Sequence, residues 1–140
     1  MEIKLSSLIE LNNIVKTYSS GETRVLALNH INLKIEQHEL LAIIGESGSG
    51  KSTMMNIVGL LDKPSSGSYQ LKGKEVAKLS EDELAAIRNQ TIGFVFQSFF
   101  LLPRSNAIKN VAIPLLYRDK SLKEAKDTAL SMLEKWGLKT

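Results

Sequence analysis

The segment that most constrains the fold of this chain is residues 45–52, which read Gly-Glu-Ser-Gly-Ser-Gly-Lys-Ser. They form a complete G-x-x-x-x-G-K-[ST] motif, and an apolar run at residues 40–44 precedes them. That order is typical of a buried parallel strand that leads through a phosphate-binding loop into a helix. The helix then directs its positive N-terminus at bound phosphates. The motif predicts binding of a nucleoside triphosphate, with a plain glycine-rich turn as the alternative.

The residue types of the motif suggest a role for each part of the loop. We expect the loop amides and the ammonium of Lys51 to hold the β- and γ-phosphates of ATP, and the Ser52 hydroxyl to contact Mg²⁺. The candidate nucleotide ligands are consecutive in the sequence: Gly45, Glu46, Ser47, Gly48, Ser49, Gly50, Lys51, Ser52 and Thr53.

The size and composition indicate one globular unit or a piece of one. The chain has 140 residues, 43% of them hydrophobic, and a net charge of +3 that is spread along the sequence. No run of like charges indicates a nucleic-acid partner. The absence of cysteine from the sequence excludes disulfides and thiolate metal sites, and no apolar window is long enough for a membrane span. We therefore expect a soluble, cytoplasmic protein.

Short-range patterns predict an antiparallel β-layer beside the phosphate loop. Residues 8–18 read as a strand, residues 19–22 as a turn, and residues 25–35 as a second strand that alternates apolar and polar positions at its end. After the helix that follows the loop, turn residues lead into a short strand at residues 68–73.

The second half of the chain predicts helices and one more strand. A capping box at residues 80–83 predicts a helix that begins at Ser80 and ends near Asn89. Residues 91–96 read as a second buried strand, and residues 106–116 as a helix disturbed by Pro114. A second capping box at residues 121–124 opens a helix whose apolar face comprises Leu122, Ala125, Ala129, Met132, Leu133 and Trp136.

Over nearly its whole length the chain resembles the ATP-binding subunit of ABC transporters, most closely the branch of the MacB-type macrolide exporters and the lipoprotein-release ATPases. The resemblance is carried by residues 45–53, 56–67 and 79–88, and most specifically by residues 92–97 and 101–103. It implies an α/β fold: a P-loop NTPase core with an incomplete parallel sheet, an N-terminal antiparallel β-layer and part of a helical subdomain.

The resemblance also implies roles for three residues outside the loop. Tyr18 matches the aromatic residue that stacks on adenine, although tyrosines also pack in protein cores. Val25 would contact the same base or ribose, with an ordinary strand valine as the alternative. Gln97 matches the glutamine of the Q-loop, which reaches Mg²⁺ or the attacking water, and a polar residue that ends a strand is its alternative.

Partners follow from the same resemblance. Four apolar residues after Gln97 would form an exposed patch that receives a helix from the transmembrane subunit: Phe99, Phe100, Leu101 and Leu102. A second ATP-binding subunit would complete a dimer around two ATP molecules. The expected location is the cytoplasm, peripheral at the inner face of the plasma membrane.

Three downstream features of the family are not found in these 140 residues: the LSGGQ signature, an apolar strand ending in Asp-Glu, and a switch histidine. The nearest candidate for the carboxylate at the end of such a strand is Asp119. Pro114 interrupts the apolar run before Asp119, however, and Lys120 follows it where the family has Glu. We therefore interpret the chain as the N-terminal portion of the ATP-binding domain, with the β-layer and core at about residues 1–97 and a partial helical subdomain at about 98–140. It should bind ATP, hydrolyse it at near-background rates, and be marginally stable or associate through its exposed core.

Two other functions stay open at this stage. One is a non-catalytic nucleotide-binding or interaction module that docks on a membrane partner through residues 99–102. The other is a small P-loop kinase, which would need a strand-end carboxylate and an arginine-bearing lid. Neither feature is visible in the sequence.

Overall fold

The computed structural model describes residues 7–98, 100–118 and 120–138. Contacts divide the chain into two compact units, residues 1–85 and residues 86–140. Within the described ranges, no helix has the length and hydrophobicity needed to cross a membrane.

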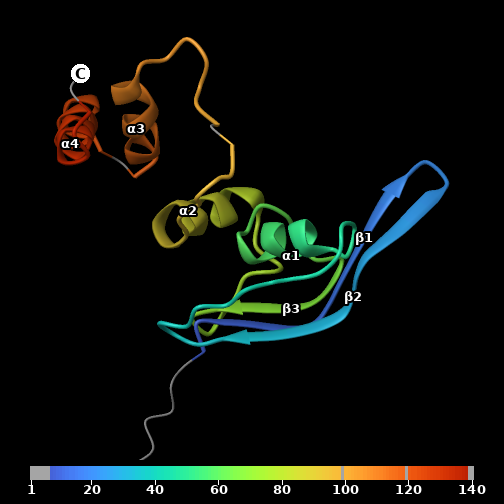
Figure 1. The fold of residues 1–140 in the computed structure, drawn as a ribbon. Helices are drawn as coiled ribbons and strands as arrows, with labels where there is room; N and C mark the ends of the chain where they lie inside the picture. Colours follow the sequence, from blue (N-terminus) through green and yellow to red (C-terminus); the bar gives the residue numbers. More distant parts are fainter. Residues whose placement is uncertain (1–6, 99, 119, 139–140) are drawn as a thin grey trace, which may run out of the picture. The chain divides into compact units, whose positions relative to one another are not determined.

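The described part of the first unit is built on an antiparallel sheet with strand order β2-β1-β3-β4 (Figure 1). The strands are β1 (Ile9–Ser20), β2 (Thr23–Ile35), β3 (Ser66–Leu71) and β4 (Lys74–Glu75). β1 pairs with β2 through the register Ile9↔Ile35 to Ser20↔Thr23, and with β3 from Ile9↔Leu71 to Val15↔Ser66. The predicted β-layer is therefore present, and β4 is an additional strand that the sequence patterns did not indicate.

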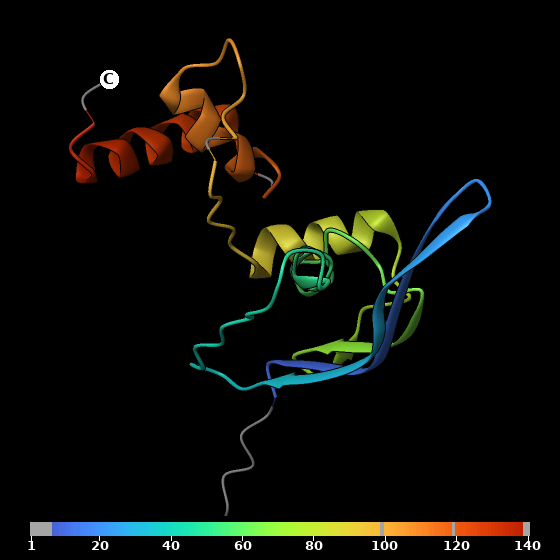
Figure 2. The same cartoon turned by 45° about the vertical axis from the view of Figure 1, so that its right-hand side comes forward.

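The far end of the β1–β2 hairpin extends beyond the last β3 pair as a two-stranded ribbon. Pairing of β1 with β3 ends at Val15, whereas pairing with β2 continues to Ser20. Both views show this ribbon projecting past the rest of the sheet (Figures 1 and 2). Tyr18 and Val25 lie on this ribbon, directly opposite each other.

Helix α1 (Lys51–Val58) follows the phosphate loop and packs on the sheet. It buries Met54 and Ile57, and the hydroxyl of Tyr69 in β3 donates a hydrogen bond of 2.8 Å to the carbonyl of Val58. Other buried apolar side chains of this unit complete the core: Leu11, Ile14, Leu28, Leu60, Leu71, Val76 and Leu84. Burial raises the pKa of the Tyr69 phenol far above its usual range, so the group stays a hydrogen-bond donor.

The two predicted core strands are not formed, and this corrects both predictions. Residues 40–44 run as a loop, in which Leu40 is 98% and Ile44 90% exposed (Figure 2). Residues 92–96 have no regular structure, and Thr91 is the last residue of the preceding helix. A strand takes its backbone hydrogen bonds from neighbouring strands. Every strand pair in the described ranges is antiparallel and lies in the β-layer, so these two apolar runs have no partner.

Helix α2 (Glu81–Thr91) begins where the first capping box predicts. The Glu83 carboxylate accepts hydrogen bonds from the Ser80 amide (2.8 Å) and hydroxyl (2.9 Å), and the Glu83 amide donates to the Ser80 hydroxyl (3.3 Å). The helix crosses the boundary between the two units and ends two residues later than predicted.

The second unit contains α3 (Ala107–Leu116) and α4 (Leu122–Lys135), which pack together through Ala112, Ala125 and Ala129. The Asn106 side chain caps α3, which includes Pro114, and a complete Ser121–Glu124 capping box opens α4. The predicted apolar face of α4 is only partly correct. Its buried residues are Ala125, Ala129 and Leu133, whereas Leu122, Met132 and Trp136 are exposed.

Candidate nucleotide-binding site

Residues 45–50 form a tight loop that passes directly into α1. The Ser49 amide donates to the Glu46 carbonyl at 3.3 Å, and the Met54 amide donates to the Gly50 carbonyl at 2.8 Å, which closes the first helical turn. Gly50, at the N-cap position, has a φ of 88° and supplies no side chain to the helix start. Because the first N–H groups of a helix have no intrahelical acceptor, this end of α1 directs donors toward the loop.

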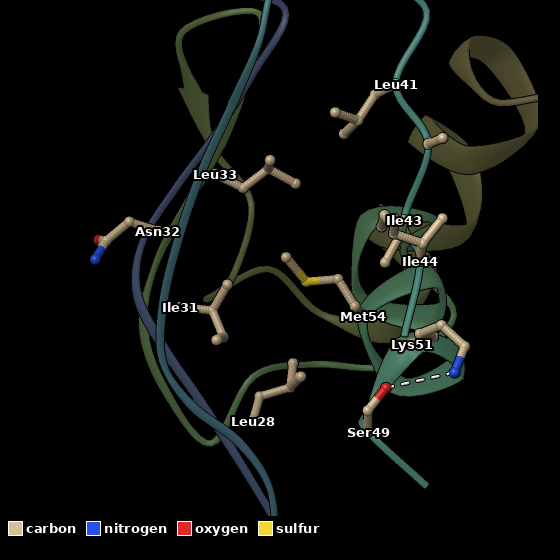
Figure 3. Close-up of a pocket in the computed structure, with 12 residues that line it drawn as sticks. Leu28, Ile31, Asn32, Leu33, Leu41, Ile43, Ile44, Ser49, Lys51 and Met54 are labelled. Carbon is tan, nitrogen blue, oxygen red and sulfur yellow. Dashed lines mark hydrogen bonds between the residues drawn. The ribbon is translucent and has the colours of Figure 1, made fainter. Parts of the chain in front are cut away.

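The ammonium of Lys51 lies over this loop. It donates to the Gly45 carbonyl at 2.8 Å and to the Glu46 carbonyl. It also donates weakly to the Ser49 hydroxyl at 3.4 Å (Figure 3). A positive charge is thus placed at the mouth of a loop whose helix end also favours anions. The first part of the site is therefore suited to a phosphate group.

Strand β2 holds the loop through Gly50. A β-carbon built on Gly50 would lie 2.6 Å from the Ala27 carbonyl oxygen and 3.0 Å from a methyl carbon of Leu28. Glycine is therefore required here for two reasons, since the positive φ also disfavours any other residue. The close approach fixes the phosphate loop against one point of the sheet.

Val25 lies a short distance along β2 from this contact, and Tyr18 lies opposite it on β1. They form a cross-strand pair on the ribbon, and pairs directly opposite in an antiparallel sheet have their side chains on the same face. Val25 is two residues from Ala27, which is roughly 7 Å along a strand. Tyr18 is 42% exposed, so its ring is not part of the core. Val25 and the point of β2 that contacts Gly50 therefore lie close together, with Tyr18 opposite Val25 on β1, and the roles of Tyr18 and Val25 at the base stay predictions.

A groove of about 370 Å³ lies between β2 and the loop that leads to the phosphate site. One wall consists of β2 side chains, including Leu28, Ile31 and Leu33, and the other includes Leu41, Ile43 and Met54 (Figure 3). Ser49, Gly50 and Lys51 border the groove. The groove is mostly apolar and is lined in part by residues 41–44, which belong to the run that was expected to be buried in a parallel sheet.

The residues at this site could hold Mg²⁺ only together with bound phosphate groups, which would supply further ligands to the ion. In the described ranges, no group of three or more His, Asp or Glu side chains could hold a metal ion by itself. Ser52 lies exposed in the first turn of α1, next to Lys51, where a hydroxyl could complete the coordination of a phosphate-bound ion. Mg²⁺ typically keeps several waters and takes one or two protein ligands beside substrate phosphates, which agrees with this donor set.

The remaining predicted site residues belong to the second unit. Gln97 is exposed and follows residues 92–96, and its role at Mg²⁺ stays a prediction. Phe100, Leu101 and Leu102 are exposed at 74%, 66% and 50%, while Phe99 and Asp119 lie outside the described residues. The Phe100 ring packs edge-on against that of Phe96, with centroids 5.1 Å apart. Three of the four apolar residues of the predicted patch, residues 100–102, are therefore exposed, and their contact with a transmembrane subunit stays a prediction.

Two residues that contact Tyr18, Asp62 and Lys16, were not predicted from the sequence. The Tyr18 hydroxyl donates to the Asp62 carboxylate at 2.8 Å, and the Lys16 ammonium forms an ion pair of 2.6 Å with the other oxygen of the same carboxylate. Lys16 also lies over the Tyr18 ring, 4.9 Å from its centroid. A lysine two residues before Tyr18 is a weak local signal for a contact between the two. Nothing in the sequence, however, links Lys16 or Tyr18 to Asp62.

Comparison with known proteins identifies the family. The protein family described as "ABC transporter" matches residues 28–140. The chain is 53% identical over 131 residues to the macrolide export ATP-binding/permease protein MacB of Bdellovibrio bacteriovorus, covering 94% of this chain and 20% of that protein. It is 49% identical over 130 residues to the lipoprotein-releasing system ATP-binding protein LolD of Pseudoalteromonas translucida, covering 93% of this chain and 56% of that protein.

Solved structures agree with these relatives. The ATP-binding cassette MJ0796, in a dimeric post-hydrolysis state bound to ADP and phosphate, matches with a TM-score of 0.79 and 43% identity, covering 90% of this chain and 56% of that chain. A second dimeric structure of this cassette matches equally well, at 44% identity. The chain thus spans a fifth of the MacB protein and a little over half of the separate ATP-binding proteins and cassettes. With its P-loop NTPase fold class, it belongs to the family of ABC transporter ATP-binding proteins.

Proposed function

We propose that this chain is the N-terminal portion of an ABC transporter's ATP-binding domain and that it binds ATP with Mg²⁺. The observation that carries the proposal is the contact between Gly50 and Ala27, because it joins the phosphate loop to the strand that bears Val25 opposite Tyr18. The loop and Lys51 would hold the phosphates, and the exposed Tyr18–Val25 pair would receive the base.

Mg²⁺ would be held by the Ser52 hydroxyl together with the nucleotide's own phosphates. When bound, the ion supplies positive charge that neutralises the β- and γ-phosphates. The chain's own contribution is to position the phosphates: the loop backbone surrounds them, and Lys51 provides a cation within reach of Gly45 and Glu46.

Binding and hydrolysis are separate proposals. Phosphoryl transfer requires a carboxylate at the metal and a group that orients water, in addition to the loop. Gln97 is the candidate for the second role. No strand of the described residues ends in Asp-Glu, and we propose that the 140-residue chain binds ATP but turns it over at near-background rates.

The proposed physiological role is macrolide export or lipoprotein release, the activities named for the relatives, at the cytoplasmic face of a membrane. The exposed patch at residues 100–102 would contact a transmembrane subunit, since contiguous exposed apolar surface marks interaction sites. A second ATP-binding subunit would complete the assembly, as in the dimeric form of the MJ0796 cassette. In this chain, residues 1–97 would form the β-layer and core of the ATP-binding domain, and residues 98–140 would form part of its helical subdomain.

Isothermal titration of the 140-residue chain with Mg·ATP tests the binding proposal. Lys51→Ala removes the cation over the loop, and we expect it to weaken ATP binding at least about tenfold, the scale of one charge-assisted contact. Lys123→Ala, a matched change on the exposed surface of α4, should leave binding unchanged. Equal affinities for the wild type and Lys51→Ala would overturn the role of the loop.

A steady-state ATPase assay tests the second proposal. We expect turnover close to the rate without protein and no difference between the wild type and Lys51→Ala. Turnover that is clearly above background and vanishes in Lys51→Ala would show that these residues already form a catalytic site.

Site-specific cross-linking tests the partner. Because the sequence has no cysteine, Leu101→Cys and Leu122→Cys each give a single attachment point for a photo-cross-linker, one in the patch and one on exposed α4. In membrane vesicles from the source organism, Leu101→Cys should capture one multi-spanning membrane protein that Leu122→Cys does not. Equal labelling from both positions would contradict docking through residues 100–102.

The exposed patch also supports a second candidate function, a non-catalytic module that docks on a membrane partner. In that case Leu101→Cys would capture its partner equally well with and without Mg·ATP, and Lys51→Ala would not alter the capture. A capture that depends on nucleotide favours the transporter assignment instead.

A further inference from the structure

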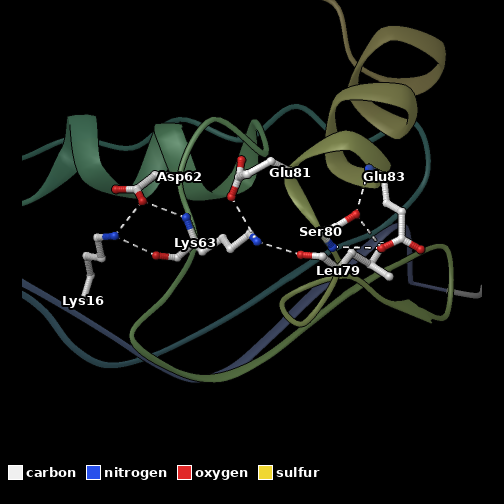
Figure 4. A network of polar contacts seen from close by, with 7 residues as sticks. All are labelled: Lys16, Asp62, Lys63, Leu79, Ser80, Glu81 and Glu83. Carbon is white, nitrogen blue, oxygen red and sulfur yellow. Dashed lines mark hydrogen bonds and ion pairs between the residues drawn. The ribbon is translucent and has the colours of Figure 1, made fainter.

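Asp62 lies in the turn after α1, and its carboxylate connects this turn to the ribbon. One of its carboxylate oxygens accepts from the Lys16 ammonium at 2.6 Å, and the other accepts from the Tyr18 hydroxyl at 2.8 Å. The amide of Lys63 donates to the same carboxylate at 2.7 Å (Figure 4). The contacts with Lys16 and Tyr18 join residues more than 40 positions apart in the sequence.

Lys16 holds the same ring from a second direction. Its ammonium lies 4.9 Å from the centroid of the Tyr18 ring and also donates to the Lys63 carbonyl at 2.8 Å. The Lys16 side chain is only 12% exposed, so the ion pair with Asp62 is partly shielded from water. The hydroxyl of Tyr18 is thus tied to Asp62, and one face of its ring is covered by a cation.

The network continues through Lys63 to the start of α2. The Lys63 ammonium donates to the Leu79 carbonyl at 2.7 Å and forms an ion pair of 3.0 Å with Glu81 (Figure 4). Asp62 is therefore fixed by a turn with its own contacts. Partial burial would raise the pKa of Asp62, but the hydrogen bonds from Lys16, Tyr18 and Lys63 and the charge of Lys16 together lower it.

We propose that Asp62 and Lys16 are positioning residues for the base of the nucleotide, an inference that rests on the proposed role of Tyr18 as the base-stacking residue. They hold the Tyr18 ring with one face against Lys16, and the ring, which is 42% exposed, would receive a purine on its other face. The ribbon needs such support, because β3 no longer pairs with β1 at this position. A ring that is already fixed loses less conformational entropy when the base binds.

The proposal predicts an effect that depends on the base. Inorganic tripolyphosphate carries the phosphates of ATP without the base, so it contacts the loop and not Tyr18. Asp62→Ala should weaken ATP binding about 3- to 30-fold, less than the roughly 5- to 150-fold expected from losing a whole base–aromatic stack. Tripolyphosphate binding should change less than twofold.

The experiment is isothermal titration of the 140-residue chain with Mg·ATP and with Mg·tripolyphosphate. The variants are Asp62→Ala, Lys16→Met, which keeps most of the stem and removes the charge, and Tyr18→Phe, which removes only the hydroxyl. Asp127→Ala, at an exposed carboxylate of α4, is the matched control and should bind both ligands as the wild type does. If Asp62 acts through the hydroxyl, the Asp62→Ala/Tyr18→Phe double variant should lose no more ATP affinity than Asp62→Ala alone.

The outcomes separate the two proposals. Tyr18→Ala binding ATP as tightly as the wild type would show that Tyr18 does not stack on the base, and the proposed function would fail at this residue. If Tyr18→Ala weakens ATP binding but Asp62→Ala and Tyr18→Phe do not, the positioning role alone is wrong. Equal losses for ATP and tripolyphosphate in Asp62→Ala would indicate a purely structural role. Should Asp62→Ala fail to fold in a thermal melt, Tyr18→Phe decides, since unchanged ATP affinity in that variant overturns the inference.

Discussion

The carbonyl oxygen of Ala27 lies 2.6 Å from the position that a β-carbon would occupy on Gly50. The backbone of β2 at Ala27 therefore packs directly against the backbone of the phosphate loop at Gly50. Gly50→Ala should destabilise the chain by roughly 2–4 kcal/mol, since it adds the strain of an alanine at positive φ to an overpacked contact. Urea unfolding followed by circular dichroism measures the change.

Gly73→Ala is the matched control for this prediction. Gly73 also has a positive φ, of 77°, but an added β-carbon there meets nothing within 4 Å. It should lose only the strain, about 1–2 kcal/mol. Equal losses in the two variants would show that the contact with Ala27 yields without cost.

The hydrogen bond from Tyr69 to Val58 predicts a stability effect without a change of shape. Tyr69→Phe leaves the ring in place but removes the donor to a carbonyl at the end of α1. We expect a loss of about 1–2 kcal/mol in the free energy of unfolding, with an unchanged urea m-value. Tyr117→Phe, at an exposed ring, should change neither quantity, and an equal loss there would contradict the assignment.

The two capping boxes predict loss of helix in acid. In the second box, hydrogen bonds from the hydroxyl and amide of Ser121 lower the pKa of Glu124, and Lys120 adds a smaller effect in the same direction. In the first box the amide and hydroxyl of Ser80 lower the pKa of Glu83. A pKa that is lower in the folded state means that the stabilisation is full above the unfolded value of about 4.3 and is lost as the pH falls below it.

Ellipticity at 222 nm should therefore decrease as the pH falls from about 5 to 3. Glutamine can still accept these hydrogen bonds and does not titrate, so the Glu83→Gln/Glu124→Gln variant should show a flatter acid profile. Glu134→Gln, on α4 outside the box, is the control and should follow the wild type. Identical acid profiles for all three proteins would show that the capping carboxylates do not cause the loss of helix in acid.

The exposed apolar loop at residues 40–44 predicts self-association of the 140-residue chain. Leu40 and Ile44 present large apolar side chains to solvent beside an apolar groove. Sedimentation velocity should show a weight-average mass that rises with concentration, and Leu40→Lys/Ile44→Lys should reduce the rise. Leu122→Lys, at an exposed apolar residue of α4, should not. A single monomeric species with a sharp, concentration-independent unfolding transition would contradict the prediction.

Local signals predicted the helix starts and the hairpin because their physical cause is short-range. The Ser80 and Ser121 boxes each involve residues three positions apart, and the turn at residues 21–22 follows directly from the first strand. Residues 40–44 and 92–96 could not be predicted in the same way. An apolar run becomes a strand only where another strand pairs with it, and pairing is a property of the whole sheet.

Two further features depended on distant contacts. The spacing of Ala125, Ala129 and Leu133 showed which side of α4 is apolar, but not how much of that side α3 covers, so Leu122 and Trp136 remained exposed. The phosphate loop was recognised from its motif alone, whereas the support of Tyr18 by Asp62 joins residues 44 positions apart and has no sequence signature.

The ribbon at the end of the β1–β2 hairpin bears on the order of events during nucleotide exchange. Two-stranded ribbons are only marginally stable in water, while the phosphate loop is held by close backbone packing at Gly50. If Tyr18 and Lys51 have their proposed roles, the flexible ribbon holds the base of the nucleotide and the more rigid phosphate loop holds its phosphates. Phosphate capture would precede base stacking on entry, and departure would begin at the base, so that the ribbon releases its end of the nucleotide first while the phosphate loop sets how long the ligand stays bound.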